Sequence, residues 1–227
     1  IREAIELLSV DSAYTDTGGL YGFPDLEPGI YRVSEVIPEP LPVWVPTTPA
    51  EYSVTVQAGQ NVTGVDFGNV ALGGIGARTI GYWKNHVERI TPEMYAALDV
   101  LPAFTGCGNP DSVLAILRAP WPDMRAKLRA QLLAMTLNVL SGTVSGDVHV
   151  YLGWDAVAAE LLFGVPAPSF KRAQEVLDAV ELAYDWGGWC RSEQEVVKDL
   201  LDRMNNDLPF VLAGPPRGHG RLEELEG

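Results

Sequence analysis

Basic residues are scarce in this chain of 227 residues. Lysine and arginine together number 16 against 30 aspartates and glutamates, and the formal net charge is −14. Nucleic acids and anionic membrane surfaces attract lysine and arginine, so this balance argues against both as partners. No apolar run approaches the roughly 20 residues that a transmembrane helix needs, so we expect no membrane insertion. The length suffices for one large domain or two small ones.

Motifs of known enzymes and metal sites are also absent. The sequence contains no G-x-S-x-G, H-E-x-x-H or phosphate-binding P-loop. His86, His149 and His219 share no metal-ligand spacing with one another or with the cysteines. We therefore expect no enzyme, no cofactor and no metal, and keep a hydrolase only as the third functional alternative.

Strand patterns separated by turn residues fill residues 1–70. Apolar and polar residues alternate in 30–36 and in 52–56, which is the period of a half-buried strand. Further strands are expected at 4–10, 20–23 and 62–70. Short strands at this spacing favour a β-sandwich.

A glycine-rich segment, residues 71–80, follows the β half; its first seven residues are uncharged, which is typical of a domain boundary. The hydrophobic period then becomes helical. Thr91-Pro92-Glu93 supplies an N-cap, a first-turn proline and an acid, and Asn109-Pro110-Asp111 repeats this pattern before another helix. We therefore expect a helical domain at 81–207 and an extended tail at 208–227.

Within the helical domain, the longest helix is predicted at 124–140, where Ser141-Gly142 ends it. Further helices are predicted at 155–163 and 169–184. A last helix should begin at a capping box made by Ser192 and Glu195.

Three stretches of the β half carry a family resemblance. They read T-D-T-G-G-L-Y-G-F-P-D-L-E-P-G-I-Y-R-V-S-E, then V-T-V-Q-A-G-Q, then V-D-F-G-N. Together they resemble the prealbumin-like B-type repeats of bacterial surface adhesins, whose pattern T-D-x-x-G-x-Y-x-F-x-x-L-x-P-G-x-Y-x-V-x-E closes on F-G-N. The match covers most of residues 5–70.

The resemblance implies an α+β multidomain protein. Its N-terminal part would be an antiparallel β-sandwich (prealbumin/Ig-like), followed by the small helical domain. Such repeats normally begin with a further strand, so this sandwich is expected to lack its first strand and to present an unpaired edge and an open core groove. The core itself should consist of Tyr21, Phe23, Leu26, Tyr31 and Val33.

Some members of that family form a Lys–Asn isopeptide bond with the help of a glutamate. By position, Asn69 resembles the acceptor and Glu35 the glutamate. Residues 1–70 contain no lysine, so an internal bond cannot form. The alternative is that Asn69 simply ends a strand and Glu35 is solvated. The calcium loop of the family is also missing, and no calcium is expected.

A second resemblance starts the helical half. R-T-I-G-Y-W-K-N-H is similar to the opening of a helical domain in many predicted secreted prokaryotic proteins. The motif residues are expected to anchor the junction of the two domains, with Trp83 buried: Tyr82, Trp83, Lys84, Asn85 and His86. A glycan- or peptide-binding surface and a catalytic or metal site are the other interpretations.

The chain has two cysteines, Cys107 and Cys190, both in the helical half. Two buried free thiols are one interpretation. Because both resemblances point to an extracellular protein, we predict a disulfide between them. Asn61-Val62-Thr63 matches the glycosylation sequon, which matters only in a cell that modifies such sites.

The predicted function is that of a secreted structural protein of the cell surface, a subunit of a filament, matrix or surface layer. The partners would be further copies of the chain or other surface proteins. The strand that fills the groove would come either from sequence upstream of Ile1 or from a neighbouring copy, as in donor-strand exchange. The expected donor is the apolar start of the tail: Leu208, Pro209, Phe210, Val211 and Leu212. The alternative function is an adhesin module that binds a glycan or another surface ligand.

Overall fold

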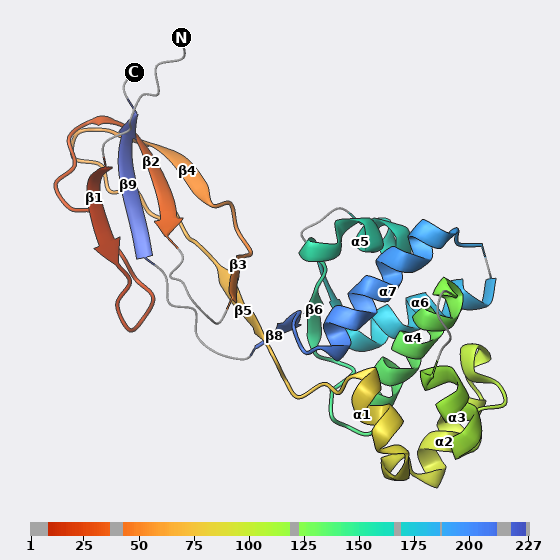
Figure 1. Cartoon of the computed structure of the whole chain (residues 1–227). Helices are drawn as coiled ribbons and strands as arrows, with labels where there is room; N and C mark the ends of the chain where they lie inside the picture. Colours follow the sequence, from red (N-terminus) through yellow and green to blue (C-terminus); the bar gives the residue numbers. More distant parts are fainter. Residues whose placement is uncertain are drawn as a thin grey trace. The chain divides into compact units, whose positions relative to one another are not determined.

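The computed structural model describes residues 9–36, 43–118, 123–165, 169–186, 188–212 and 219–225. In this part of the chain the fold is mixed α/β, with seven α-helices and antiparallel sheets. The chain divides into two compact units (Figure 1). The β unit comprises Ile1–Ala71 and Ala213–Gly227, and the helical unit comprises Leu72–Leu212. Both ends of the chain therefore belong to the β unit, and the helical unit is an insertion between them.

The sheet of the β unit has the order β1-β9-β2-β4 and is antiparallel throughout. β9 (His219–Leu225), from the C-terminal tail, lies between β1 (Ser9–Tyr14) and β2 (Gly29–Val36), as Figure 1 shows. β4 (Glu51–Val56) pairs with the other edge of β2. β2 and β4 confirm the strands predicted at 30–36 and 52–56, whereas the central strand β9 was not predicted.

Alternation along β2 produces the small core of the β unit. Tyr31 and Val33 are buried, whereas Arg32 and Ser34 between and beyond them are only partly covered. Half-buried side chains pack against this pair, including Tyr21, Phe23 and Leu26. The five residues predicted to form this core therefore do gather in one cluster.

Two of the predicted strands do not form. Residues 20–24 and 61–68 belong to no strand ladder. The last predicted strand instead appears as β5 (Asn69–Gly73), next to β3 (Val43–Pro46). A strand needs a neighbour for its backbone hydrogen bonds, and the alternating pattern alone cannot supply one. Of the strand predicted at 4–10, residues 4–8 lie outside the described residues.

The helical unit contains the remaining elements. They are α1 (Ile80–Asn85), η1 (Val87–Arg89), α2 (Pro92–Asp99), η2 (Pro102–Phe104), α3 (Pro110–Leu117), α4 (Met124–Leu140), β6 (His149–Tyr151), η3 (Gly153–Asp155), α5 (Ala156–Phe163), β7 (Phe170–Arg172), α6 (Ala173–Trp186), α7 (Arg191–Asn205) and β8 (Phe210–Val211). None of the described helices is both long and apolar enough to cross a bilayer.

Local capping signals account for several helix starts. The side chain of Thr91 accepts a hydrogen bond from the Met94 amide at the start of α2, and Asn109 does the same for Ser112 at α3. In each helix a proline occupies the first turn, where its missing N–H costs nothing. These starts confirm the N-terminal signals read from the sequence.

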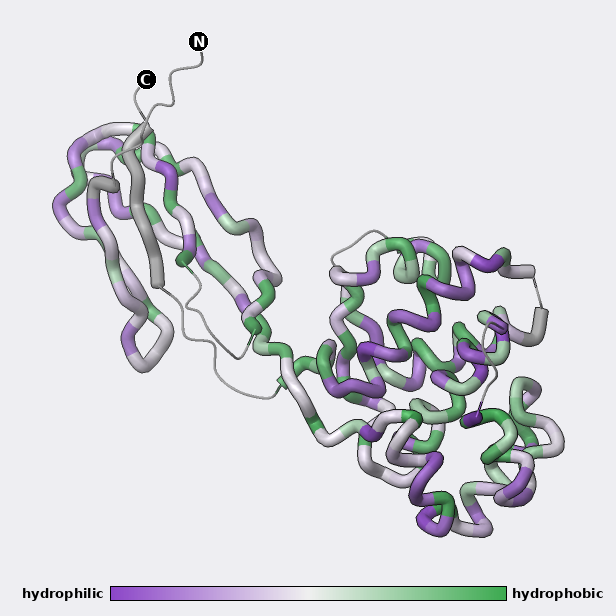
Figure 2. Tube along the Cα trace, in the orientation of Figure 1, coloured by the Kyte–Doolittle hydropathy of each residue, from purple (hydrophilic) through white to green (hydrophobic). Residues whose placement is uncertain are grey.

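α4 is the central helix of this unit and has the predicted bounds. It contacts α1, α2, α3, α6 and α7. Residues 132–138 are all buried, so the helix is enclosed on every side there, which explains its long hydrophobic stretch (Figure 2).

Two predicted helix starts were wrong. Residues 170–172 form β7, paired with β6, and α6 begins only at Ala173. α7 begins at Arg191, with Cys190 as its N-cap and the Glu193 carboxylate accepting from the Cys190 amide. The capping box is therefore made by Cys190 and Glu193, and not by Ser192 and Glu195 as predicted.

Candidate functional site

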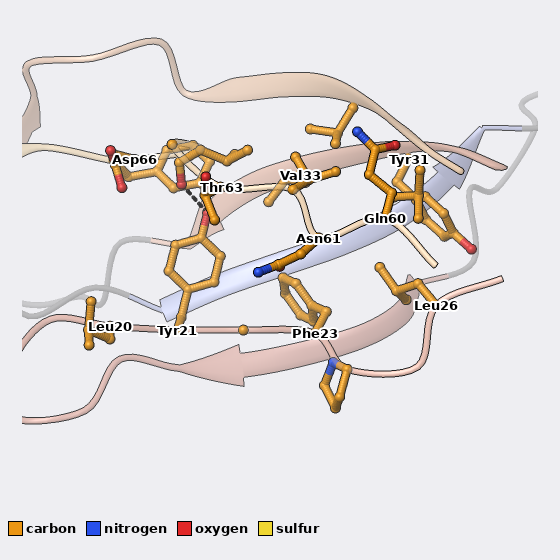
Figure 3. Close-up of a pocket in the computed structure, with 18 of the residues that line it drawn as sticks. Leu20, Tyr21, Phe23, Leu26, Tyr31, Val33, Gln60, Asn61, Thr63 and Asp66 are labelled. Atoms are coloured by element: carbon orange, nitrogen blue, oxygen red, sulfur yellow. Dashed lines mark hydrogen bonds between the residues drawn. The ribbon is translucent and has the colours of Figure 1, made fainter. Parts of the chain in front are cut away.

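The β unit contains a groove of about 1150 Å³, lined by residues between Thr15 and Asn69 (Figure 3). One wall is the inner face of the sheet, with Tyr31 and Val33 from β2 and Val54 and Val56 from β4. The opposite walls come from 19–26 and 57–67, which include the two segments without strand partners. An open groove, as expected from the sequence, is thus present in the β unit.

Side-chain hydrogen bonds hold the two unpaired segments in place. The Asp16 carboxylate accepts from the amides of Gly18 and Leu20, at 2.8 and 2.9 Å, and so sets the turn before 20–24. The Tyr21 hydroxyl donates to the Val65 carbonyl, which links the two segments across the groove. The 61–68 segment belongs to no ladder and is positioned by such side-chain bonds and by the Gly68 carbonyl, which accepts from the Thr47 amide at 2.7 Å.

Aromatic rings cover much of the groove interior. Tyr21 lies 5.9 Å from Phe23 and 6.2 Å from Phe67 between ring centroids, and all three line the groove. These three rings are only half-buried. The groove thus leaves apolar surface in contact with water, which an occupant could cover at a gain of about 25 cal/mol per Å².

The charges in the groove are all negative. Asp25, Glu35 and Asp66 line it, and no lysine, arginine or histidine is among the described lining residues. Burial, with a smaller contribution from Asp66, raises the pKa of Tyr21 to about 12, so its phenol stays a neutral donor at ordinary pH. The groove is therefore suited to an apolar occupant that also carries positive charge.

Glu35 and Asn69 meet at the floor of the groove. The side-chain amide of Asn69 donates to one oxygen of the Glu35 carboxylate. Burial raises the pKa of Glu35, and the Asn69 hydrogen bond opposes that shift. The other Asn69 side-chain atom, Oδ1, is buried and has no hydrogen-bond partner in the described structure. Asn69 Oδ1 is thus an acceptor without a donor in the described structure, next to the Glu35 carboxylate.

The structure brings together the two residues assigned by the adhesin-repeat resemblance. Glu35 is thus partly buried and accepts a hydrogen bond from Asn69, whereas the alternative prediction was a solvated side chain. A lysine is still missing, because residues 1–70 contain none. An isopeptide-type role for this pair stays a prediction.

The motif 82–86 lies in the helical unit, across α1 and its C-cap. Trp83 is buried at 2% exposure, as predicted, and belongs to the core of this unit. Lys84 and Asn85 are exposed, and Tyr82 stacks on His86 with centroids 4.6 Å apart. Of the five motif residues, Trp83 is the one that is buried in this core, and the half-buried Tyr82 packs against it.

A buried amide network holds Trp83. The indole Nε1 donates to Oδ1 of Asn138 on α4 at 3.2 Å, and the same oxygen accepts from the Arg78 amide. The Asn138 amide donates to the Arg78 carbonyl and to Asn205 Oδ1 on α7. Asn138 is completely buried, and these hydrogen bonds offset the free-energy cost of burying its polar side chain.

The glycine-rich segment is not a free linker. The Asp207 carboxylate accepts hydrogen bonds from the amides of Ile75, Gly76 and Ala77, at 2.8–3.1 Å. A Cβ on Gly74 would lie 2.5 Å from the same carboxylate, so this glycine is needed for the close approach. Asp207 itself has a φ of 65°. The expected hinge is therefore fastened within the helical unit.

Replacing Asp207 by alanine is expected to destabilise the helical unit by about 2–4 kcal/mol, because three backbone amides lose a charged acceptor. Urea unfolding followed by helical circular dichroism measures this. Asp207→Gly removes the acceptor without the left-handed backbone strain, and Asp207→Asn keeps one oxygen and tolerates that backbone. We expect the order of stability Asn, then Gly, then Ala. An alanine variant as stable as the asparagine variant would contradict the role of the carboxylate.

The predicted disulfide is wrong, because both cysteines are free. Cys107 is buried in the core directly after η2, whereas Cys190 is exposed at the start of α7 with its Sγ 3.0 Å from Ser192 Oγ. The two thiols are therefore separate, one buried and one exposed.

The predicted donor segment is also wrong. Phe210 is completely buried in the core of the helical unit, and β8 pairs with Leu72–Gly73 of β5 and with β6. Pro209 is buried as well, and its carbonyl accepts from the Tyr151 amide. Leu208 is half exposed, and Val211 and Leu212 are partly covered. The segment 208–212 is apolar because part of it lies in the core of the helical unit, and it is not a free strand for a neighbouring copy.

No group of three or more possible metal ligands occurs among the described residues. The site residues that sequence reasoning missed are Asn138, Asn205 and Asp207. A polar residue inside the apolar run 132–140 was a usable signal for Asn138, because a buried amide requires partners. No local signal identified Asp207, whose partners lie about 130 positions earlier in the chain.

The chain was compared with protein-family models, curated proteins and solved structures, and none of the three comparisons found a match.

Proposed function

We propose that this chain is a secreted structural protein of the cell surface, a subunit of an extracellular assembly, joined to its neighbours through the groove of the β unit. The observation that carries the proposal is an open groove with aromatic and aliphatic lining residues, walled by two segments without ladder partners. Such a groove is the receptor half of strand complementation, in which an added strand supplies backbone hydrogen bonds and side chains together. The resemblance to adhesin repeats supports the extracellular location.

A glycan-binding adhesin module is the second candidate. The same groove combines the rings of Tyr21 and Phe23 with the polar side chains of Gln60, Asn61 and Thr63 (Figure 3). Apolar surfaces with a few convergent polar groups are common in small-ligand sites.

The test of assembly uses the producing cells, with a tagged copy of the chain. We expect the chain in sedimenting extracellular material that shows ordered assemblies in electron micrographs. Asn61→Trp places a large ring at an exposed position of the groove lining, and this variant should be released as free subunits.

Thr55→Trp is the matched control, because Thr55 is exposed on β4 outside the groove lining. It should be incorporated like the parent chain. The proposal fails if the parent chain is found only as free monomer, or if Asn61→Trp assembles normally. Binding to a glycan array that Asn61→Trp abolishes, without assemblies, would establish the adhesin alternative.

A further inference from the structure

We propose that the helical unit binds a neutral saccharide on the outward face of the paired strands β6 and β7. The rings of Tyr151, Trp154 and Phe170 stack on the sugar, and the Arg172 guanidinium with its neighbouring carboxylates binds the hydroxyl groups. All of these residues belong to the helical unit, so the site is separate from the groove of the β unit and does not depend on the proposed function.

The register of the strand pair determines which side chains share this face. β6 and β7 are antiparallel, with His149 opposite Arg172 and Tyr151 opposite Phe170. Opposite residues of an antiparallel pair point to the same side, and successive residues point to opposite sides. Val150, between His149 and Tyr151, is completely buried in the core. The four paired side chains therefore share the face that turns away from this core.

Three aromatic rings form one cluster on this face. The centroid of Tyr151 lies 5.3 Å from that of Phe170 and 5.6 Å from that of Trp154. The Tyr151 and Phe170 rings are half-buried, and Trp154 is 39% exposed. One face of a pyranose ring consists mainly of C–H groups, so it can cover such apolar surface and remove it from water.

Gly153 fixes the position of the central ring. A Cβ on this residue would overlap the phenol end of Tyr151, so the glycine allows the ring to lie against the backbone of η3. The Tyr151 amide donates to the Pro209 carbonyl at 2.8 Å, which holds the backbone of the same residue. A ring that is already fixed loses little conformational entropy when a ligand binds.

Charged side chains lie beside the rings. The Arg172 guanidinium is 3.5 Å from the Asp147 carboxylate and 3.2 Å from the Glu175 carboxylate. Arg172 and Asp147 are exposed, and Glu175 is half-exposed. Together they offer donors and acceptors, and a sugar hydroxyl can both donate and accept. One positive and two negative charges leave this cluster negative, which favours a neutral saccharide over an anionic one.

The edge of β7 is poorly suited to an added peptide strand. β7 is at the edge of the described sheet but is only three residues long. The Arg172 amide already donates to the Glu175 carboxylate at 2.9 Å. A short edge with an occupied donor offers an added strand few backbone hydrogen bonds. The exposed rings and charged side chains therefore favour a ligand that is bound by side chains, as a saccharide is.

The test uses the purified full chain and hexasaccharides of glucose, mannose and N-acetylglucosamine, each with a sulfated counterpart. Isothermal titration calorimetry measures affinity, and hydrogen exchange locates the bound sugar. Trp154→Ala removes the exposed ring, whereas Gly153→Ala keeps all three rings but displaces Tyr151. Tyr14→Ala is the matched control, because it removes an exposed ring from β1 in the other unit. Helical circular dichroism verifies that each variant is folded.

We expect at least one neutral hexasaccharide to bind more tightly than its sulfated counterpart. Trp154→Ala and Gly153→Ala should each weaken this binding at least about tenfold, because the stacking surface is lost or displaced. Tyr14→Ala should leave the affinity unchanged. The bound sugar should slow hydrogen exchange in residues 149–154 and 170–172.

Several results would overturn the inference. Binding of none of the neutral hexasaccharides, or of the sulfated ones alone, would refute a site for neutral saccharides. Unchanged affinity in Trp154→Ala would exclude the aromatic cluster. Slower exchange in residues 19–26 and 57–67 instead would place the sugar in the groove and support the adhesin alternative. Self-association of the purified chain that Trp154→Ala abolishes, without sugar binding, would make this face a contact between copies.

Discussion

Replacing Trp83 by alanine is expected to lower the free energy of unfolding of the helical unit by about 3–5 kcal/mol. Trp83 is 2% exposed, so its removal leaves a large cavity in the core against α4. It also takes away the donor to Asn138 Oδ1. Urea unfolding followed by helical circular dichroism measures the loss, because all described helices belong to this unit.

Two further variants separate the contributions of Trp83. Trp83→Phe keeps most of the ring but loses the indole N–H, and we expect a cost of about 1–2 kcal/mol. Trp154→Ala removes the same side chain from a site that is 39% exposed, and should cost much less. If Trp83→Ala and Trp154→Ala unfold at the same urea concentration, Trp83 is not the anchor of this unit.

Replacing Asn138 by alanine is expected to cost a similar amount, about 3–5 kcal/mol, for a different reason. The lost volume is small, but the change leaves the Arg78 backbone, the Trp83 indole and the Asn205 side chain short of partners in a buried site. Each buried polar group without a partner costs about 1–3 kcal/mol. The same unfolding measurement applies.

Asn206→Ala is the matched control for Asn138. Asn206 is exposed at the end of α7, and its side chain bonds only to Asp202 in the described structure. Its replacement should change stability by no more than about 0.5 kcal/mol. If Asn138→Ala also changes the free energy of unfolding by no more than about 0.5 kcal/mol, water or rearranged neighbours must supply the missing hydrogen bonds.

The groove depends on a β unit with a small core. Tyr31 and Val33 are the buried members of its central cluster among the described residues, and half-buried aromatic side chains surround them. An entering strand would therefore both bind and stabilise this unit, since a ligand that binds only the folded state shifts the folding equilibrium. Binding of such a strand is thus expected to raise the free energy of unfolding of the β unit.

The sequence by itself determined the elements whose signals are local. β2 and β4 follow from alternation, α2 and α3 from their capping residues, and α4 from a long apolar period that ends at Gly142. The Glu35 and Asn69 positions also came from the sequence, through a resemblance. In each case, neighbours within a few residues, or a recognisable motif, carry the information.

Only the tertiary structure decided the remaining features, because they join residues far apart in the chain. The tail strand β9 enters between β1 and β2, and the cysteines remain separate. Asn138 meets Trp83 across 55 positions, and Asp207 holds the glycine-rich segment across about 130. Residues 20–24 and 61–68 have the sequence pattern of strands but pair with no strand in the described structure, since pairing depends on what lies beside a segment and not on its own sequence.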